Sequence, residues 1–378
     1  MPERPLRVGL NLLYLVEGSA GAGRYAFELL PALLAAEPGP ELTAFVNKDT
    51  PRALFEQRWS EGVEWVRLPV GIASKAHLVA QMAALPVSAA RRRLDVLHSL
   101  ANIGPLVTPG VARVVTLLDV IWLHQGAAWE GGYAARGFAS LSSVCARNAD
   151  HVLTISEAAR DDIVASLGLD PGKVDVAPLG VRPPQSVSRR DRTGDPVVLC
   201  VAQKRPYKNL GSLIRALAEL EESVTLVLAG APTPHEEELK ALAAELGVAD
   251  RVRFPGWVSE AELETLFAEA TCFVLPSLIE GFGLPVLEAM ARDVPVACSN
   301  RPALPEVVGD AALLFDPEDQ EAVTAAVRRL LRDEALAHAL VERGRQRVRA
   351  FTWERTARAT LESYRKALAG KGRIPAPV

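Results

Sequence analysis

Two glutamates, Glu280 and Glu288, bracket a Gly-Phe-Gly turn in the stretch PSLIEGFGLPVLEAMA. Carboxylate oxygens accept hydrogen bonds from hydroxyl groups. Gly281 and Gly283 lie at the expected start of a helix, because Pro285 suits a first helical residue. Backbone N–H groups at a helix start have no intrahelical partner and bind phosphate or hydroxyl oxygens, and glycine lets such a ligand approach closely. The stretch therefore predicts one wall of a site for phosphate or sugar hydroxyl groups.

A second interpretation of these residues involves folding alone. Ser277 and Glu280 fit the S-x-x-E capping box, and Glu288 in a first helical turn would favour the helix dipole. For each glutamate taken singly, this explanation stays open. It does not explain the turn, because Gly-Phe-Gly is a poor helix former. The pair with its glycines therefore favours ligand binding.

A basic cluster, QKRPYKN, follows the strand-like run Val197 to Val201. Arginine binds two phosphate oxygens at once and lysine supplies a point charge, so the cluster suits a diphosphate. We expect Arg205 and Lys208 to point into the same cleft as the glycine turn. No Asp-x-Asp sequence occurs and the six histidines show no ligand spacing, so a required metal ion is not expected.

The elements that must position these residues alternate between strand and helix along the chain. In the first half, the pattern predicts strands at 8–13, 42–46, 64–68, 96–98, 114–117 and 151–155, with helices at 75–93 and 137–149 among the connections. In the second half, it predicts strands at 197–201, 224–229, 252–254, 272–275, 294–298 and 312–315, again with helices between them. Such alternation is typical of parallel sheets.

The segment RPPQSVSRRDRTGD separates the two series and has no apolar period, so it predicts a linker. The sequence thus predicts an α/β chain with two Rossmann-like parallel-sheet domains facing across a cleft. We expect the first domain at residues 1–182, the linker at 183–195 and the second domain at 196–352. Ligands of open parallel sheets bind at the carboxyl ends of the strands, so the cleft is the expected site.

Polar residues lie at the carboxyl ends of three of the predicted strands in the first half. His98, Asn102, Asp119 and Ser156 would line the crevice at this edge of the sheet. Each of them is also a plausible turn or cap residue, because polar side chains are common there. Both interpretations stay open.

A glycine-bearing stretch follows the first predicted strand. Gly21 and Gly23 lie in a G-x-G-x-x-A sequence, which matches a dinucleotide-binding fingerprint. Residues 14–20 separate this sequence from the strand, whereas in a dinucleotide site the glycines follow the strand directly. A loop near a ligand phosphate and an ordinary turn both remain open.

The composition sets broad limits on partners and location. The chain has 378 residues and a net charge of −4, which gives no electrostatic case for nucleic acid binding. Its four cysteines are far apart, which fits a reducing cytoplasm. No apolar run reaches roughly 18 residues and no secretory leader is expected. Arg91 to Arg93 follow a mostly apolar segment, so peripheral contact at the inner membrane face stays open beside a solvated helix face. The oligomeric state is not indicated.

The sequence resembles the retaining nucleotide-sugar glycosyltransferases of family 4, which have the two-domain GT-B architecture. The resemblance covers nearly the whole chain. It rests on the E-x7-E motif EGFGLPVLE, the phosphate-binding segment VAQKRPYKNL, the interdomain segments ADHVLTISEAARDDI and KVDVAPLGV, and PALPEVVGDAALLFDP.

This resemblance implies roles for the donor-side residues. Glu288 would hold the ribose hydroxyls of the nucleotide. Glu280 would hold the donor sugar and the distal phosphate together with the backbone of the turn. Lys208, helped by Arg205, would neutralise the diphosphate leaving group. The turn residues in question are Gly281, Phe282, Gly283 and Leu284.

The resemblance also implies roles outside that motif. Gly21 to Arg24 would form a glycine loop near the diphosphate, with Gly23 inside it. The first domain would bind the acceptor and the second the donor. The final segment, FTWERTARATLESYRKAL, would form a helix at about 353–370 that packs back on the first domain.

Two positions depart from the family pattern. Gln203 stands where many members have arginine, so Lys204 or Arg205 would have to supply that charge. Leu118 stands where many members have a histidine, just before Asp119. Either Asp119 and His124 cover the acceptor-side role, or the acceptor differs.

The implied activity is hexosyl transfer, with retention, from a nucleotide diphosphate sugar to a hydroxyl acceptor. The segments DVLHSLANIGPL and TLLDVIWLHQ look most like bacterial mannosyltransferases, which favours GDP-mannose over a UDP-hexose. The acceptor would be a saccharide, a lipid-linked sugar or a small molecule, and no cofactor is implied.

Three alternatives stay open. A nucleotide-sugar epimerase or hydrolase would need a base, with His98, Asp119 and His124 as candidates. The fingerprint around Gly21 would suit a nicotinamide-dependent oxidoreductase. A carbohydrate-binding pseudoenzyme is compatible with the two departures.

Overall fold

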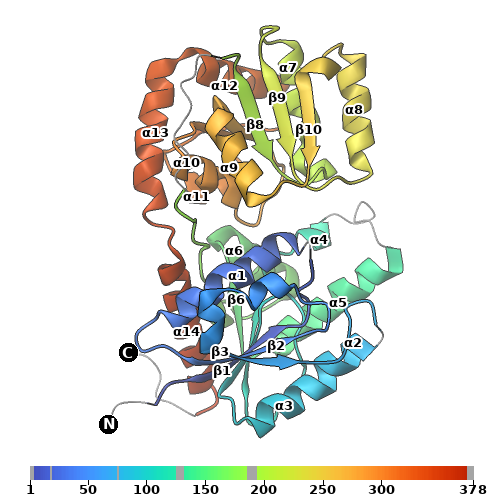
Figure 1. Cartoon of the computed structure of the whole chain (residues 1–378), viewed down its shortest axis with the longest axis vertical. Helices are drawn as coiled ribbons and strands as arrows, with labels where there is room; N and C mark the ends of the chain where they lie inside the picture. Colours follow the sequence, from blue (N-terminus) through green and yellow to red (C-terminus); the bar gives the residue numbers. More distant parts are fainter. Residues whose placement is uncertain (1–3, 18, 75, 125–131, 185–193, 373–378) are drawn as a thin grey trace. The chain divides into compact units, whose positions relative to one another are not determined.

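The chain forms two compact units in a computed structural model that describes residues 4–17, 19–74, 76–124, 132–184 and 194–372. One unit comprises Met1–Gly180 together with Trp353–Val378, and the other comprises Val181–Thr352. The first unit is therefore discontinuous in sequence, because the C-terminal helix belongs to it. Figure 1 shows the elements of each unit.

The first unit is built on a seven-stranded, wholly parallel sheet with strand order β3-β2-β1-β4-β5-β6-β7. Its strands are β1 Arg7–Leu12, β2 Glu41–Val46, β3 Val63–Arg67, β4 Val96–Ser99, β5 Ala112–Thr116, β6 His151–Thr154 and β7 Val174–Val176. The central strands β1 and β4 are almost wholly buried, as expected of a sheet covered on both faces.

The helices of this unit connect successive strands, and the C-terminal helix is an addition to them. They are α1 Ala20–Leu34, α2 Ala76–Val79, a π-helical turn at Ala80–Ala84, α3 Leu85–Arg91, α4 Ile121–His124, α5 Gly132–Asn148, α6 Glu157–Leu167 and α14 Trp353–Ala369. Helix α14 packs against α1, β5, β6 and β7.

Two polar clusters, one buried and one partly exposed, fix α14 to the first unit. In one of them, His98 on β4 lies 2.7 Å from Tyr364 Oη on α14 and 2.7 Å from Thr116 Oγ1 on β5. In the other, Asp175 accepts hydrogen bonds from Ser363 at 2.5 Å and Lys366 at 2.7 Å. These contacts explain why a helix so late in the sequence completes the N-terminal fold.

The second unit is built on a six-stranded parallel sheet with strand order β10-β9-β8-β11-β12-β13. Its strands are β8 Val197–Val201, β9 Thr225–Ala229, β10 Val252–Gly256, β11 Cys272–Leu275, β12 Val296–Ser299 and β13 Leu313–Phe315. Its helices are α7 Leu210–Ala218, α8 His235–Glu245, α9 Glu260–Glu269, α10 Leu284–Ala291, α11 Leu304–Val308, α12 Gln320–Arg332 and α13 Glu334–Val348.

Each sheet has one point at which the strand order reverses. In the second unit, β8 leads to β9 on one side, whereas the neighbouring β11 leads to β12 on the other. In the first unit, β1 and β4 are the corresponding pair. The loops that follow the two strands of such a pair lead to opposite sides of the sheet. In open parallel sheets this leaves a crevice at the carboxyl ends of the strands, where ligands usually bind.

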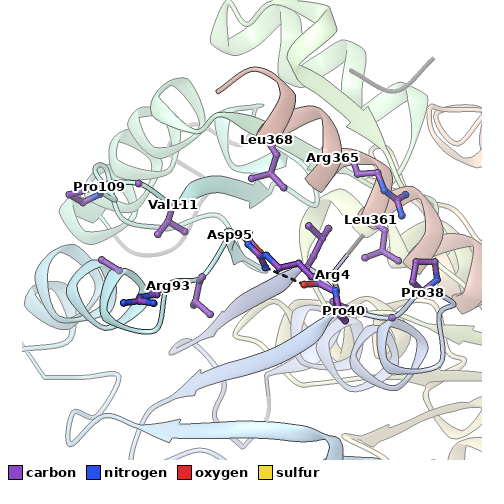
Figure 2. A pocket seen from close by; sticks show the side chains of 16 residues that line it. Arg4, Pro38, Pro40, Arg93, Asp95, Pro109, Val111, Leu361, Arg365 and Leu368 are labelled. Carbon is purple, nitrogen blue, oxygen red and sulfur yellow. Dashed lines mark hydrogen bonds and ion pairs between the residues drawn. The ribbon is translucent and has the colours of Figure 1, made fainter. Parts of the chain in front are cut away.

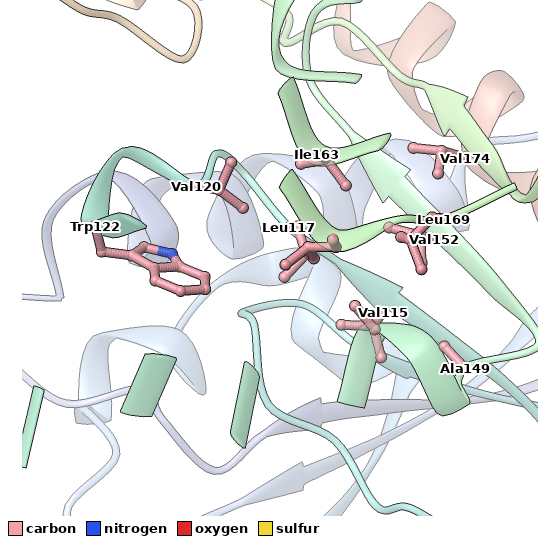
Figure 3. Close-up of a cluster of buried hydrophobic side chains, with 11 residues drawn as sticks. Val115, Leu117, Val120, Trp122, Ala149, Val152, Ile163, Leu169 and Val174 are labelled. Atoms are coloured by element: carbon pink, nitrogen blue, oxygen red, sulfur yellow. The ribbon is translucent and has the colours of Figure 1, made fainter. Parts of the chain in front are cut away.

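A hydrophobic cluster anchors the segment that follows β5 in the first unit (Figure 3). Leu117 and Val120 are buried in this cluster, with Val152 of β6 and Ile163 of α6. Asp119 lies between these two anchors in sequence, so their burial fixes the backbone that carries it.

Among the described residues, no helix combines the length and apolar character needed to cross a bilayer.

Candidate functional site

The loops that follow β8 and β11 meet at the reversal point of the second sheet. The two strands are parallel neighbours, with Cys272 opposite Val198. The backbone N–H of Leu278 donates to the carbonyl oxygen of Tyr207 at 2.8 Å, which joins one loop directly to the other. Residues of both loops therefore form the carboxyl edge at this point.

Lys208 and Glu280 form an ion pair across these loops. Lys208 Nζ lies 2.6 Å from Glu280 Oε1, and the two side chains are only 14% and 9% exposed. Ser277 Oγ donates to the same carboxylate oxygen at 2.7 Å. Lys208 Nζ also lies 5.0 Å from the centre of the Tyr207 ring, a cation–π contact. The structure thus brings together two residues that the sequence predicted separately.

The glycine turn has a folding role that its sequence did not reveal. Helix α10 begins at Leu284 with Gly283 as its N-cap, and Gly283 has a φ of 89°. A Cβ at this position would clash with Leu304 Cδ2. The neighbouring Phe282 is buried and packs edge-on against Phe351 at 5.8 Å. Gly283 is therefore required by the backbone, whether or not a ligand binds there.

The alternative that explained Ser277 and Glu280 by a capping box and Glu288 by the helix dipole is wrong. Ser277 and Glu280 precede α10, which begins at Leu284, so no capping box forms between them. Pro285 is the second residue of the helix, not the first, and Glu288 is the fifth, beyond the first turn. Glu288 is 2% exposed. Glu288 therefore lies inside the helix and does not cap it.

The prediction that Lys204 lines the donor site needs correction. Its side chain is fully buried, its Nζ donates to the carbonyl oxygen of Gly230, and Glu236 Oε2 lies 3.7 Å away. Burial lowers the pKa of Lys204, and Glu236 opposes this effect. A buried ammonium needs such acceptors, and here they hold it in the core. Gln203 stands where many family members have a positively charged arginine. Arg205, which is half-buried, is the remaining candidate to supply that charge.

The prediction that His98 lines a ligand crevice is also wrong. His98 has no exposed surface, and both of its ring nitrogens have hydrogen-bonding partners inside the first unit. Burial lowers its pKa to about 3, so the ring is neutral at physiological pH. His98 is therefore a core residue and not a candidate base.

Other candidates of the first unit do lie at the carboxyl edge. Asp119 Oδ1 accepts a hydrogen bond from the backbone N–H of Ile121 at 3.1 Å, at the start of α4. His124 ends that helix, and its Nε2 lies 2.8 Å from Asp162 Oδ2. Asn102 has a φ of 50°, and its buried Oδ1 accepts no hydrogen bond from any described residue.

The stretch around Gly21 forms a helix, not the predicted loop. Helix α1 begins at Ala20, so Gly21, Gly23 and Arg24 all lie in its first turns. The backbone N–H of Gly23 donates to the carbonyl oxygen of Ser19 at 2.6 Å. Strand β1 ends at Leu12, well before these glycines. The spacing of a dinucleotide fingerprint is therefore absent.

The cysteines and potential metal ligands show no reactive arrangement. All four cysteines are buried, and burial raises the pKa of Cys200 and of Cys272 to about 12, so these thiols are unreactive. Within the described ranges, no group of three or more His, Cys, Asp or Glu residues is arranged to hold a metal ion.

Sequence reasoning missed two contributors to the donor-side site. Ser277 was considered only as a capping residue, although the same S-x-x-E spacing lets it donate to Glu280. Tyr207 lay inside the basic cluster but had no assigned role, and it supports both the Leu278 backbone and the Lys208 ammonium.

Family comparisons agree with the geometry of the two units. Residues 20–180 match the family described as Glycosyl transferase 4-like domain. Residues 182–347 match the family described as Glycosyl transferases group 1.

Similar proteins include glycosyltransferases of known name. MMP alpha-(1->4)-mannosyltransferase of Mycolicibacterium hassiacum is 36% identical over 239 residues, which cover 62% of this chain and 58% of that protein. The D-inositol 3-phosphate glycosyltransferase of Acidothermus cellulolyticus is 31% identical over 325 residues, covering 78% of this chain and 72% of that protein. This chain therefore spans less than two thirds of the first of these relatives.

Solved structures share the fold. Sucrose-phosphate synthase from Thermosynechococcus elongatus has a TM-score of 0.78 and 23% sequence identity, covering 96% of this chain and 99% of that one. The predicted fold class, α/β with two Rossmann-like parallel sheets, is confirmed.

Proposed function

Because this chain belongs to the family 4 glycosyltransferases, we propose that it moves a hexosyl group from a nucleotide diphosphate sugar to a hydroxyl group of an acceptor, with retention at the anomeric carbon. It is mannosyltransferase-like, and we propose mannose, carried by GDP, as the sugar. A UDP-hexose is the second candidate donor.

The ion pair between Lys208 and Glu280 carries this proposal. It lies at the reversal point of the second sheet, where ligands of open α/β sheets bind. A diphosphate would take over the Lys208 ammonium, and the released Glu280 carboxylate would accept hydrogen bonds from sugar hydroxyls. Both groups are nearly buried, so their interactions with a ligand are weakly screened.

The chemistry needs no nucleophilic side chain. The bond between the anomeric carbon and the diphosphate oxygen breaks, and its electron pair stays on the diphosphate. The acceptor oxygen then bonds to the same face of the sugar, and its proton passes to the leaving phosphate. Lys208 and Arg205 would stabilise the charge that develops on the diphosphate, which is the usual largest contribution to such catalysis.

The remaining roles follow from position. Glu288, buried one turn into α10, would hold the ribose hydroxyls. Asp119 and Asn102 would serve the acceptor, a saccharide, a lipid-linked sugar or a small molecule. We place the reaction in the cytoplasm or at the inner membrane face.

The test is a thermal-shift panel of nucleosides, nucleoside diphosphates and nucleotide sugars, because a ligand that binds only the folded protein raises its melting temperature. GDP and GDP-mannose should raise Tm, and Lys208→Met should remove most of the shift. Lys48→Met is the matched control, since Lys48 is exposed and has no ion pair within the described part of the chain. If no nucleoside diphosphate raises Tm, the proposed function is wrong.

A second incubation separates transfer from epimerisation or hydrolysis on the same fold. The protein is held with the stabilising nucleotide sugar and no acceptor. The sugar should stay unchanged, and accumulation of an epimer would contradict the transferase assignment.

A further inference from the structure

A pocket of about 670 Å³ lies at the amino edge of the first unit's sheet, where β1, β2, β4 and β5 begin (Figure 2). Helix α14 provides a further wall. Asn102 and Asp119 follow the opposite, carboxyl ends of β4 and β5, so this pocket is separate from the residues assigned to transfer. Its volume lies within the range of about 300–1,000 Å³ that is usual for small-molecule sites.

The charges that line the pocket are unbalanced. Its lining contains three arginines, Arg4, Arg93 and Arg365, and one carboxylate, Asp95. Asp95 forms an ion pair with Arg4, whose two terminal nitrogens donate to the Asp95 carboxylate at 2.7 and 2.8 Å. Arg93 and Arg365 form no ion pair within the described part of the chain. In Figure 2 they lie at opposite ends of the pocket, with the Arg4–Asp95 pair between them.

The backbone at Arg93 favours a residue other than arginine. The N–H groups of Arg93 and Leu94 donate to the carbonyl oxygens of Ala90 and Ala89, at 3.0 and 3.1 Å. This is the Schellman pattern that ends helices, and its left-handed position usually holds glycine. Arg93 occupies that position with a φ of 53°. Local folding therefore does not account for an arginine at the rim of this pocket.

The remaining surface of the pocket is largely apolar. Pro5, Pro38 and Pro109 are exposed at the pocket, whereas the lining residues Val111, Leu361 and Leu368 are only 2–6% exposed and belong to the core behind it. An apolar wall beside unpaired guanidinium groups fits a molecule that has an anionic group and an apolar part. Guanidinium groups bind phosphate oxygens through paired hydrogen bonds.

We propose that this pocket binds a phosphate-bearing amphipathic molecule, with its phosphate against Arg93 or Arg365 and its apolar part on the exposed lining residues Pro5, Pro38 and Pro109. Two sources of such a phosphate are a soluble phosphate ester and a lipid headgroup in a membrane. The helical stretch that ends beside the pocket bears exposed apolar side chains, with Val79 64% and Val87 49% exposed. An apolar stripe followed by arginines is typical of a surface that contacts anionic lipid.

The first experiment titrates inorganic phosphate into the full-length protein by calorimetry. The double variant Arg93→Gly/Arg365→Gln should bind phosphate at least tenfold more weakly than the native chain. Arg93→Gly should melt at or above the native Tm, because glycine suits the left-handed position. Arg52→Gln is the control, since Arg52 is an exposed arginine of the same unit away from the pocket, and it should bind as the native chain does.

Lys208→Met separates this pocket from the donor site. The pocket should still bind phosphate in that variant. If Lys208→Met abolishes all phosphate binding while the double variant binds normally, the pocket proposal is wrong and the donor-site proposal is untouched.

The second experiment identifies the source of the phosphate with vesicles of phosphatidylcholine, with and without phosphatidic acid. Sedimentation only with acidic vesicles, lost in the double variant, supports a lipid headgroup. Phosphate binding without sedimentation supports a soluble phosphate ester. Absence of both kinds of binding overturns the proposal.

Discussion

Lys208 Nζ lies 2.6 Å from Glu280 Oε1, although the two residues are 72 positions apart in sequence. Parallel pairing of β8 with β11 brings their loops together, and Ser277 donates to the same carboxylate oxygen that Lys208 contacts. The Lys208 ammonium and the Glu280 carboxylate, whose oxygens accept hydrogen bonds from hydroxyl groups, are thus held in place before any ligand binds.

Replacing Glu280 with glutamine should weaken binding of the sugar selectively. Glu280→Gln keeps the shape but removes the charge, and a charge-assisted hydrogen bond contributes about 1.5–3 kcal/mol. Calorimetry should show the affinity for GDP-mannose falling by about tenfold or more while that for GDP changes little. Glu245→Gln, an exposed position of the same unit, should bind both ligands normally. Equal losses for both ligands would contradict a contact between Glu280 and the sugar.

Gly283 should be far less tolerant of substitution than Gly21. Gly283→Ala combines a left-handed backbone with a clash against Leu304, so we expect the free energy of unfolding to fall by about 2–4 kcal/mol. Gly21→Ala adds a methyl group in open space within a helix, where alanine is favoured by up to about 1 kcal/mol. Urea unfolding of the two variants tests this, and equal stabilities would contradict the backbone role of Gly283.

Sequence periodicity predicted most of the two sheets because apolar runs alternate regularly with helical segments. The short strand β7, Val174–Val176, was missed, since three residues carry too little periodic signal. The helix start at Ala20 was also missed, because glycines in the first turn suggested a loop.

The site was only partly predictable, because burial depends on distant residues. Lys204 and Lys208 look equivalent in the sequence, yet Gly230, 26 positions later, holds Lys204 in the core. His98 looked like a crevice residue because its partner Tyr364 is 266 positions away. Lys208 and Glu280 lie in direct contact, which depends on the pairing of β8 and β11, and their shared role in a ligand site stays a prediction.

Acidification should destabilise the first unit through His98. Burial lowers its pKa to about 3, against about 6.5 in an unfolded chain. Between these two pKa values the unfolded chain binds a proton at His98 that the folded chain does not bind. The free energy of unfolding therefore falls as the pH drops through that window, and the contribution of neutral His98 is fully present only above about pH 6.5. From pH 7.5 to pH 5 the loss should be about 2 kcal/mol. In urea unfolding, the stability gap between the native chain and His98→Gln should therefore narrow at pH 5, and a constant gap would contradict this linkage.

Asp175 should be the main polar anchor of helix α14. Burial alone would raise its pKa, but hydrogen bonds from His151, Lys366 and Ser363 lower it well below the usual value. Asp175→Asn should lower the free energy of unfolding by about 2–3 kcal/mol, because charged hydrogen bonds are lost. Lys366→Met should cost less than about 1 kcal/mol, since Lys366 is 46% exposed. Limited proteolysis should cut the chain near α14 faster in Asp175→Asn than in Lys366→Met. A larger loss of stability in Lys366→Met than in Asp175→Asn would contradict the role of Asp175.

Affinity for the diphosphate group is the most direct test of the role of Lys208. Calorimetry compares the native chain, Lys208→Met and the control Lys48→Met with two ligands, GDP and guanosine. For Lys208→Met, the account predicts that the Kd of GDP rises by about tenfold to a hundredfold, because a charged contact is lost, while the Kd of guanosine is unchanged. An unchanged Kd for GDP would contradict the assignment of Lys208 to the diphosphate.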